Sequence, residues 1–194
     1  MELELRNEQI ELHDRLYREG WETIDGEIQV HGRAPLGKPS WSARRKLKKA
    51  ISLFERTLQI NPSNWASMWA LGKIHQRTGS DATALEWLTK AHQIKPTNPD
   101  VLREAALCAL NLGKPKEAVA FTTMAIALKP DDPGLVANLA LVLLLDHKPE
   151  EAKEKAKEAV TATSNDAVSR NVLRFIDDVI SEERPYPKSF RDVR

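Results

Sequence analysis

Residues 64–97 read NWASMWALGKIHQRTGSDATALEWLTKAHQIKPT, and the stretch that follows, residues 98–131, is built on the same plan. Prolines and alanines recur through both stretches and beyond them with a 34-residue period. The recurring positions are Pro62, Pro96 and Pro130, and Ala50, Ala84, Ala118 and Ala152. A fixed period of this length is typical of stacked helical hairpins, in which each repeat buries its apolar side against its neighbours. We therefore expect an all-α fold built from repeated helix pairs.

Other positions that keep the same spacing carry the residue types that a helical hairpin needs. Side chains that cap helix N-termini precede each first helix, and prolines follow two of them. Glycines stand where two of the first helices should end, because glycine accepts a left-handed backbone. Small residues mark the expected close approach of the two helices, with larger ones across the hairpin. The caps are Asn64, Asn98, Asp132 and Asp166; the prolines Pro99 and Pro133; the terminal glycines Gly79 and Gly113; the small residues Gly72, Ala106 and Ala140; and the facing residues Phe54, Leu88, Thr122 and Ala156.

The combined pattern resembles the tetratricopeptide repeat family over roughly residues 42–166. One repeat holds Met68, Leu71, Gly72, His75, Ala84, Leu88, Ala91 and Pro96 at the family's signature places. The resemblance implies a right-handed α-solenoid of about three hairpins, residues 65–98, 99–132 and 133–166. In the third repeat Ser164 stands where the family has proline.

Both flanks of the repeats depart from the pattern. Residues 1–41 contain an amphipathic stretch, Asn7 to Ile24, followed by a long connection from residue 25 to 41. The stretch could pair with residues 42–62 as an irregular first hairpin, or remain a free helix that mediates dimerisation or packs into the groove. Residues 167–184 are expected to form a capping helix, with Arg174 where the family has a small residue, and residues 185–194 to form a tail.

The composition excludes several classes of function. A formal net charge of +1 provides no overall attraction to nucleic acid or an anionic membrane. One cysteine, Cys108, allows no internal disulfide and lies in an apolar run where we expect it to be packed. The charged N-terminus lacks the apolar core of a signal peptide, so we expect a cytoplasmic protein. No metal-binding histidine pair, glycine-rich phosphate loop or GxSxG motif is present, so we expect neither an enzyme nor a cofactor.

In the family that the sequence resembles, the first helices of successive hairpins line a concave groove. Carried over to this sequence, the groove would be polar and cationic at one end and apolar at the other. An acidic group of a bound partner would then lie near Trp69 and Arg103, and apolar anchors near the leucines. The alternative is that the protein's own capping helix or tail covers the leucines. The predicted partner-binding residues are Trp69, Lys73, Gln76, Arg77, Arg103, Leu107, Leu110, Leu141 and Leu144.

The resemblance also allows one family activity to be tested against the sequence. Some members bind the carboxylate end of chaperones through lysines, asparagines and an arginine. At those places this sequence has Trp69, Glu104, Gly134 and Asn138, and the Glu104 carboxylate would repel a carboxylate ligand. We therefore do not expect that activity.

A basic run, residues 44–49, is the strongest local charge feature. Its cations are Arg44, Arg45, Lys46, Lys48 and Lys49. The run could be a solvated surface, a site for an acidic protein, or a site for nucleic acid.

The first functional hypothesis is a non-enzymatic scaffold, adaptor or chaperone-like protein that holds a segment of a protein partner. Narrower versions are a type III secretion-type chaperone or a toxin-neutralising immunity protein, and the alternative from another class is nucleic-acid binding through the basic run.

Overall fold

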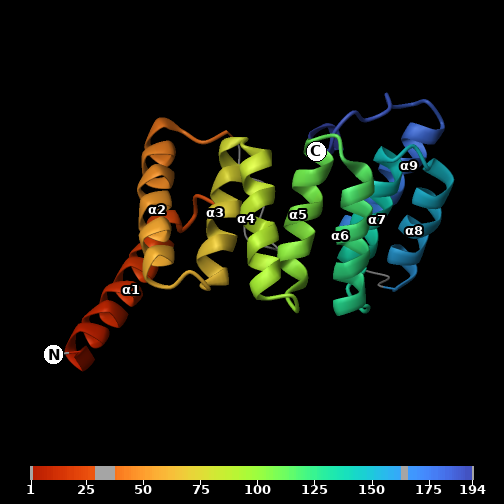
Figure 1. The fold of residues 1–194 in the computed structure, drawn as a ribbon. Helices are drawn as coiled ribbons and strands as arrows, with labels where there is room; N and C mark the ends of the chain where they lie inside the picture. Colours follow the sequence, from red (N-terminus) through yellow and green to blue (C-terminus); the bar gives the residue numbers. More distant parts are fainter. Residues whose placement is uncertain (1, 29–37, 163–165, 194) are drawn as a thin grey trace. The chain divides into compact units, whose positions relative to one another are not determined.

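The computed structural model describes residues 2–28, 38–162 and 166–193, and within these ranges it contains helices and no strands (Figure 1). The chain divides into two compact units, Met1–Pro96 and Thr97–Arg194. The first unit contains α1 (Glu2–Ile24), α2 (Trp41–Ile60), α3 (Trp65–Thr78) and α4 (Asp81–Ile94). The second contains α5 (Pro99–Asn111), α6 (Pro115–Leu128), α7 (Pro133–Leu145), α8 (Pro149–Ala162), α9 (Ala167–Ile180) and a short 3₁₀ helix, η1 (Phe190–Val193).

Consecutive helices pair as hairpins inside each unit. In the first unit α1 pairs with α2 and α3 with α4, and α2 also packs against α3. In the second unit α5 pairs with α6 and α7 with α8, while α6 packs on α7 and α9 packs on both α7 and α8. The all-α helical-repeat fold predicted from the sequence is thus confirmed. Among the described residues, no helix combines the length and the apolar character that a membrane crossing requires.

The repeated polar residues cap the helices that they precede. The side-chain oxygen of Asn64 accepts a hydrogen bond from the backbone N–H of Ser67 at 2.9 Å, and Asn98, Asp132 and Asp166 accept equivalent bonds at the starts of α5, α7 and α9. Each such cap stabilises a helix start by about 1 kcal/mol. The four predicted caps are therefore confirmed.

The glycines predicted to end the first helices adopt the required left-handed backbone. Gly79 has a φ of 84° and Gly113 a φ of 68°. The next position in this periodic series is His147, which takes a φ of 59° although it carries a side chain. A left-handed backbone at a residue other than glycine costs about 1 kcal/mol or more, so the surrounding structure must hold His147 in place.

The two helices of a hairpin approach most closely at small residues. In the second hairpin a Cβ added to Gly72 would lie 2.7 Å from Cγ of Leu88, closer than packed carbon atoms allow. Ala50, Ala84, Ala118 and Ala152 are all fully buried, as are Phe54 and Leu88 across the hairpins. The small-residue positions predicted from the periodic spacing are thus confirmed as contact points.

The first hairpin has the same contact, at a position that the repeat spacing does not reveal. A Cβ added to Gly20 of α1 would lie 2.8 Å from the Phe54 ring, and Phe54 precedes Leu88 by one repeat period. Gly20, however, precedes Gly72 by more than one period, so the first hairpin is longer than those that follow. Most of the extra length lies in its connection, residues 25–40, of which residues 29–37 are outside the described ranges. In the second hairpin residues 79 and 80 alone join the two helices.

Helix α1 begins at Glu2, five residues before the predicted start at Asn7. The residues between them are glutamate, leucine and arginine, which favour helix more than most. The helix buries Leu16, Gly20 and Ile24 against the first unit, and these residues follow one another at the four-residue spacing of a single helix face.

We predict that Gly72→Ala destabilises the first unit. The added methyl group must displace Leu88, at a cost of about 1 to 3 kcal/mol, which outweighs the gain of about 1 kcal/mol in helix propensity. In a Leu88→Ala background the same change should instead be neutral or stabilising, because the clash is gone. Chemical denaturation of the four proteins in this double-mutant cycle measures both values. Equal destabilisation in both backgrounds would contradict the contact.

Candidate functional site

Four aromatic rings follow one another across α1 and α3 in the first unit. The ring centroids of His13 and Tyr17 are 6.3 Å apart, those of Tyr17 and Trp21 are 6.2 Å apart, and those of Trp21 and Trp69 are 5.7 Å apart. All four side chains are half-buried. We call this set the ring ladder. It combines the predicted residue Trp69 with three residues of α1.

The rings of the ladder contact residues of α2 and of the segment that caps α3. The Phe54 ring of α2 contacts Tyr17 at 6.4 Å and Trp21 at 5.6 Å between centroids, both edge to face. The side-chain oxygen of Asn64 caps α3, and its amide nitrogen lies 3.0 Å from Nε2 of His13. Because the amide nitrogen is a donor, Nε2 of His13 is the acceptor, and Nδ1–H of His13 donates to the Asp14 carboxylate. These contacts position the rings of His13, Tyr17 and Trp21 within the first unit.

The two tryptophans of the ladder carry hydrogen-bond donors that the described parts of the protein do not use. Nε1 of Trp21 and Nε1 of Trp69 are both buried, and neither has a hydrogen-bond partner among the described residues. A buried donor without a partner costs about 1 to 3 kcal/mol. Because both nitrogens are shielded from the surface, a bound partner would contact the accessible parts of the two rings and not these donors.

The other predicted residues of α3 lie next to the ladder but are engaged within the protein. Lys73 is buried and Gln76 is half-buried, and both make polar interactions. Nε of Arg77 donates to the backbone carbonyl of Glu27 at 2.9 Å, which ties the end of α3 to the residues that follow α1. Arg77 thus helps to position α1 against α3.

A shallow hollow of about 400 Å³ lies beyond the His13 end of the ladder. It is lined by Ile10, whose side chain is 53% exposed, and by His13, with Ile60 and Asn61 at the end of α2. Its polar rim is completed by α1 residues before Ile10, namely Arg6 and Gln9. An apolar side chain of a partner could enter it while the rest of the partner follows the rings.

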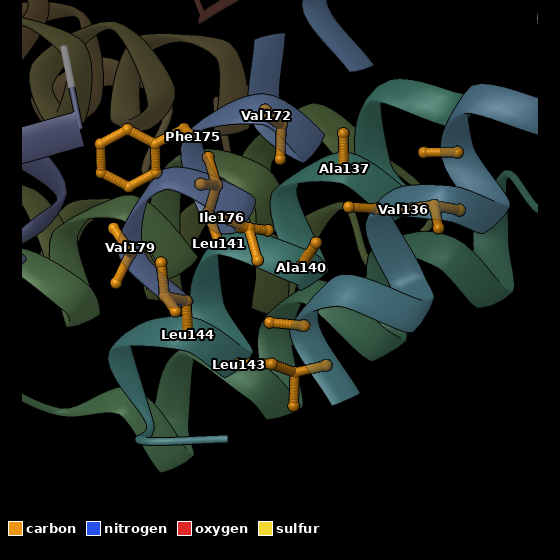
Figure 2. Packing of buried hydrophobic residues seen from close by; sticks show 13 residues of the cluster. Val136, Ala137, Ala140, Leu141, Leu143, Leu144, Val172, Phe175, Ile176 and Val179 are labelled. Carbon is orange, nitrogen blue, oxygen red and sulfur yellow. The ribbon is translucent and has the colours of Figure 1, made fainter. Parts of the chain in front are cut away.

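In the second unit, the leucines predicted to face a partner are covered. Leu144 has no exposed surface and Leu141 is 4% exposed. Figure 2 shows Phe175, Ile176 and Val179 of α9 packed against these two residues of α7. Leu141 and Leu144 are therefore covered by α9 in this structure, and partner binding by these two residues stays a prediction.

The segment after α9 closes the same side of the second unit further. The hydroxyl group of Tyr186 donates to the backbone carbonyl of Leu144, and its ring stacks on His147 at 5.1 Å. Burial raises the pKa of the Tyr186 hydroxyl. Pro187 is buried, and η1 packs against α5. The stack on Tyr186 is one contact that holds His147 in its left-handed backbone.

The remaining predicted residues of the second unit lie on α5. The Arg103 guanidinium pairs with Asp100 at 2.9 Å and lies 3.8 Å from the Glu104 carboxylate, and its side chain is only 11% exposed. Leu110 is buried and Leu107 is half-buried. Of these three, Leu107 keeps the most accessible apolar surface, and Arg103 is already neutralised by its neighbours.

The basic run at residues 44–49 lies on α2, and two of its cations are paired with carboxylates of the first unit. Nζ of Lys46 binds the Glu27 carboxylate at 2.8 Å, and Nζ of Lys49 binds the Glu19 carboxylate at 2.7 Å. The hydrogen bond from Lys49 lowers the pKa of Glu19. No group of histidine, cysteine, aspartate and glutamate within the described ranges could hold a metal ion.

Comparison with known protein families gives one partial match. The family model described as "Anaphase-promoting complex, cyclosome, subunit 3" matches residues 43–125. The transcription factor tau 131 kDa subunit of Saccharomyces cerevisiae (strain ATCC 204508 / S288c) is 30% identical over 61 residues. That match spans 31% of this chain and only 6% of the yeast protein.

Solved structures with similar folds include tetratricopeptide-repeat proteins. The first repeat domain of Spaghetti (RPAP3), solved with an HSP90 peptide SRMEEVD, has a TM-score of 0.55 and 21% identity, over 60% of this chain and 93% of that one. YrrB, described as having an unusual peptide-binding site, has a TM-score of 0.60 and 16% identity, over 78% of this chain and 76% of that one. These similarities show that the chain has the helical-repeat fold of these proteins.

Tyr17 and Trp21 are residues of the ring ladder on α1 that the groove prediction did not include. Counting back from Gly72 to Gly20 aligns Tyr17 with Trp69 and Trp21 with Lys73. The feature of the sequence that could have indicated this alignment was Gly20, a glycine within the predicted amphipathic helix. The predicted groove combines residues of α3 in the first unit with residues of α5 and α7 in the second. That combination remains a prediction.

We predict that Tyr186→Phe lowers the stability of the second unit by about 1 kcal/mol, because the hydrogen bond to the Leu144 carbonyl is lost while the ring remains. Tyr17→Phe is the matched control, since the hydroxyl of Tyr17 has no hydrogen-bond partner in the described ranges. Urea denaturation measures both. Equal effects of the two substitutions would show that the Tyr186 hydroxyl contributes nothing.

Proposed function

We propose that this chain is a non-enzymatic protein-binding module that holds a segment of another protein along the ring ladder of its first unit. The observation that carries the proposal is the ladder itself: four half-buried aromatic rings on α1 and α3 that follow one another and keep part of their surface accessible. Tryptophan and tyrosine are enriched among the residues that dominate binding energies at protein interfaces.

The chemistry of the ladder defines the ligand that it suits. The accessible parts of the rings favour apolar or flat groups. A polypeptide segment suits this surface, because several of its side chains can lie on successive rings. An apolar side chain of the same segment would enter the hollow beside Ile10.

The burial of apolar side chains in the second unit also supports placing the ligand on the first unit. There Leu141 and Leu144 of α7 are already covered by α9, which leaves almost none of their surface to a partner. RPAP3 and YrrB, which share the fold, are described with a bound peptide and a peptide-binding site respectively. A scaffold, a chaperone-like protein, a secretion chaperone and an immunity protein would all use such a surface in the same way.

The test is affinity purification of this protein from cells of its own organism, with wild-type protein and Trp69→Ala as baits. We expect Trp69→Ala to weaken recovery of the bound protein strongly, because truncating a central aromatic residue costs about 2 kcal/mol or more, roughly a 30-fold change in Kd. Trp69→Phe should have an intermediate effect, because it keeps an aromatic ring of smaller area.

The matched control is Ile94→Ala, which truncates an exposed apolar side chain on α4 of the same unit. It should retain the bound protein, and circular dichroism should show that all variants remain helical. Equal recovery with Trp69→Ala and wild-type protein would contradict binding at the ladder. Loss of the partner on Arg103→Glu, with no effect of Trp69→Ala, would move the site to α5.

A further inference from the structure

The ion pairs of α2 divide its basic residues into two sets with different surroundings. Lys46 and Lys49 each bind one carboxylate, that of Glu27 and that of Glu19 respectively. The other cations of the run are exposed, and none of them has a carboxylate partner within the described ranges; they are Arg44, Arg45 and Lys48. A run of cations in the sequence thus becomes a neutralised set and a cationic set in the structure.

An exposed tryptophan adjoins the cationic set. The side chain of Trp41, the first residue of α2, is 76% exposed, the most of any large apolar side chain in the described parts of the chain. The Arg45 guanidinium lies 6.0 Å from the centroid of its ring, and Nε of Arg44 donates to the backbone carbonyl of Pro39 at 3.4 Å. Trp41, Arg44, Arg45 and Lys48 therefore form one surface, which we call the α2 face.

The α2 face is electrostatically unfavourable when it is bare. Its cations are close in sequence, and they lie in the first turns of a helix that has no acidic residue in its first turn. The partial positive charge of a helix N-terminus adds to their repulsion. The side chain of Ser40 caps the helix by accepting from the N–H of Ala43, but it contributes no negative charge. Anionic groups from outside would relieve this repulsion.

We propose that the α2 face docks an acidic segment of another protein, with carboxylates on Arg44, Arg45 and Lys48 and an apolar side chain on Trp41. This surface is separate from the ring ladder, because the residues of the α2 face are exposed on α2 whereas the ladder lies on α1 and α3. Arginine binds carboxylates through two parallel hydrogen bonds, and tryptophan offers a large rigid surface to an apolar side chain.

The charges favour an acidic protein over a nucleic acid as the occupant. Three cations would neutralise few phosphates, and the chain's formal net charge of +1 adds no long-range attraction. A short acidic segment can place its carboxylates on the three cations and end there.

The experiment measures fluorescence anisotropy of a fluorescein-labelled peptide, Glu-Glu-Leu-Glu-Glu-Phe-Glu-Glu, titrated with the full chain at about 50 mM salt, where exposed charges interact measurably. We expect saturable binding that a peptide with glutamine in place of every glutamate does not show. Arg44→Ala/Arg45→Ala/Lys48→Ala should raise Kd about tenfold, because exposed charge pairs are individually weak and three of them are lost together. Trp41→Ala should raise it about threefold.

The matched control is Lys46→Ala/Lys49→Ala, which removes cations from the same helix that already bind carboxylates. It should change Kd less than about twofold. Thermal melts followed by circular dichroism verify that each variant is folded. Equal losses in the two multiple variants, no saturable binding of the acidic peptide, or tighter binding of labelled oligouridine than of the peptide would each overturn the proposal. The last result would identify a nucleic-acid surface instead.

Discussion

Both hairpins of the first unit depend on one contact, in which a small residue on one helix lets a side chain of the other approach it. Gly72 meets Leu88 in the second hairpin and Gly20 meets Phe54 in the first, with no room for a methyl group at either glycine. Buried alanines one repeat apart do the same work on the second helices. Because this contact fixes how the helices of a pair are rotated, it also decides which side chains remain on the accessible faces.

The consequence differs between the two units. In the first unit the Gly20 contact holds α1 so that Tyr17 and Trp21 line up with Trp69 of α3, and the protein leaves their rings half-buried. In the second unit α7 carries leucines that α9 and the following segment cover. The same helical repeat thus gives one unit with an accessible aromatic surface and another whose apolar face is used for its own stability.

Much of this arrangement could be predicted from the sequence, because it repeats. The caps, the helix-ending glycines and the small contact residues recur at a constant spacing, and each has a local physical role. The pairing of α1 with α2 was harder to predict from the sequence, because the long connection between them breaks the periodic spacing between Gly20 and Gly72. Tyr17 and Trp21 were therefore predicted only as residues of an amphipathic helix.

Other features depend on contacts between segments far apart in the sequence, which a periodic pattern does not contain. The leucines of α7 look the same in sequence whether α9 covers them or a partner does. The basic run of α2 is divided by carboxylates on α1 and just after it, so the cations of the α2 face could be identified only from the folded chain. His147 stands in a glycine position, and the ring that stacks on it, Tyr186, comes from a segment outside the repeats.

Hydrogen exchange of the full chain, followed by mass spectrometry, tests most directly whether α1 is part of the first unit. If the Gly20 contact holds α1 in a hairpin with α2, the amides of residues 16–24 should be protected to the same extent as those of α3 and α4, because they open with the unit. Exchange of residues 16–24 as fast as in an unfolded peptide, while α3 and α4 stay protected, would contradict this. Such a result would show α1 to be a free helix and would remove the ring ladder with it.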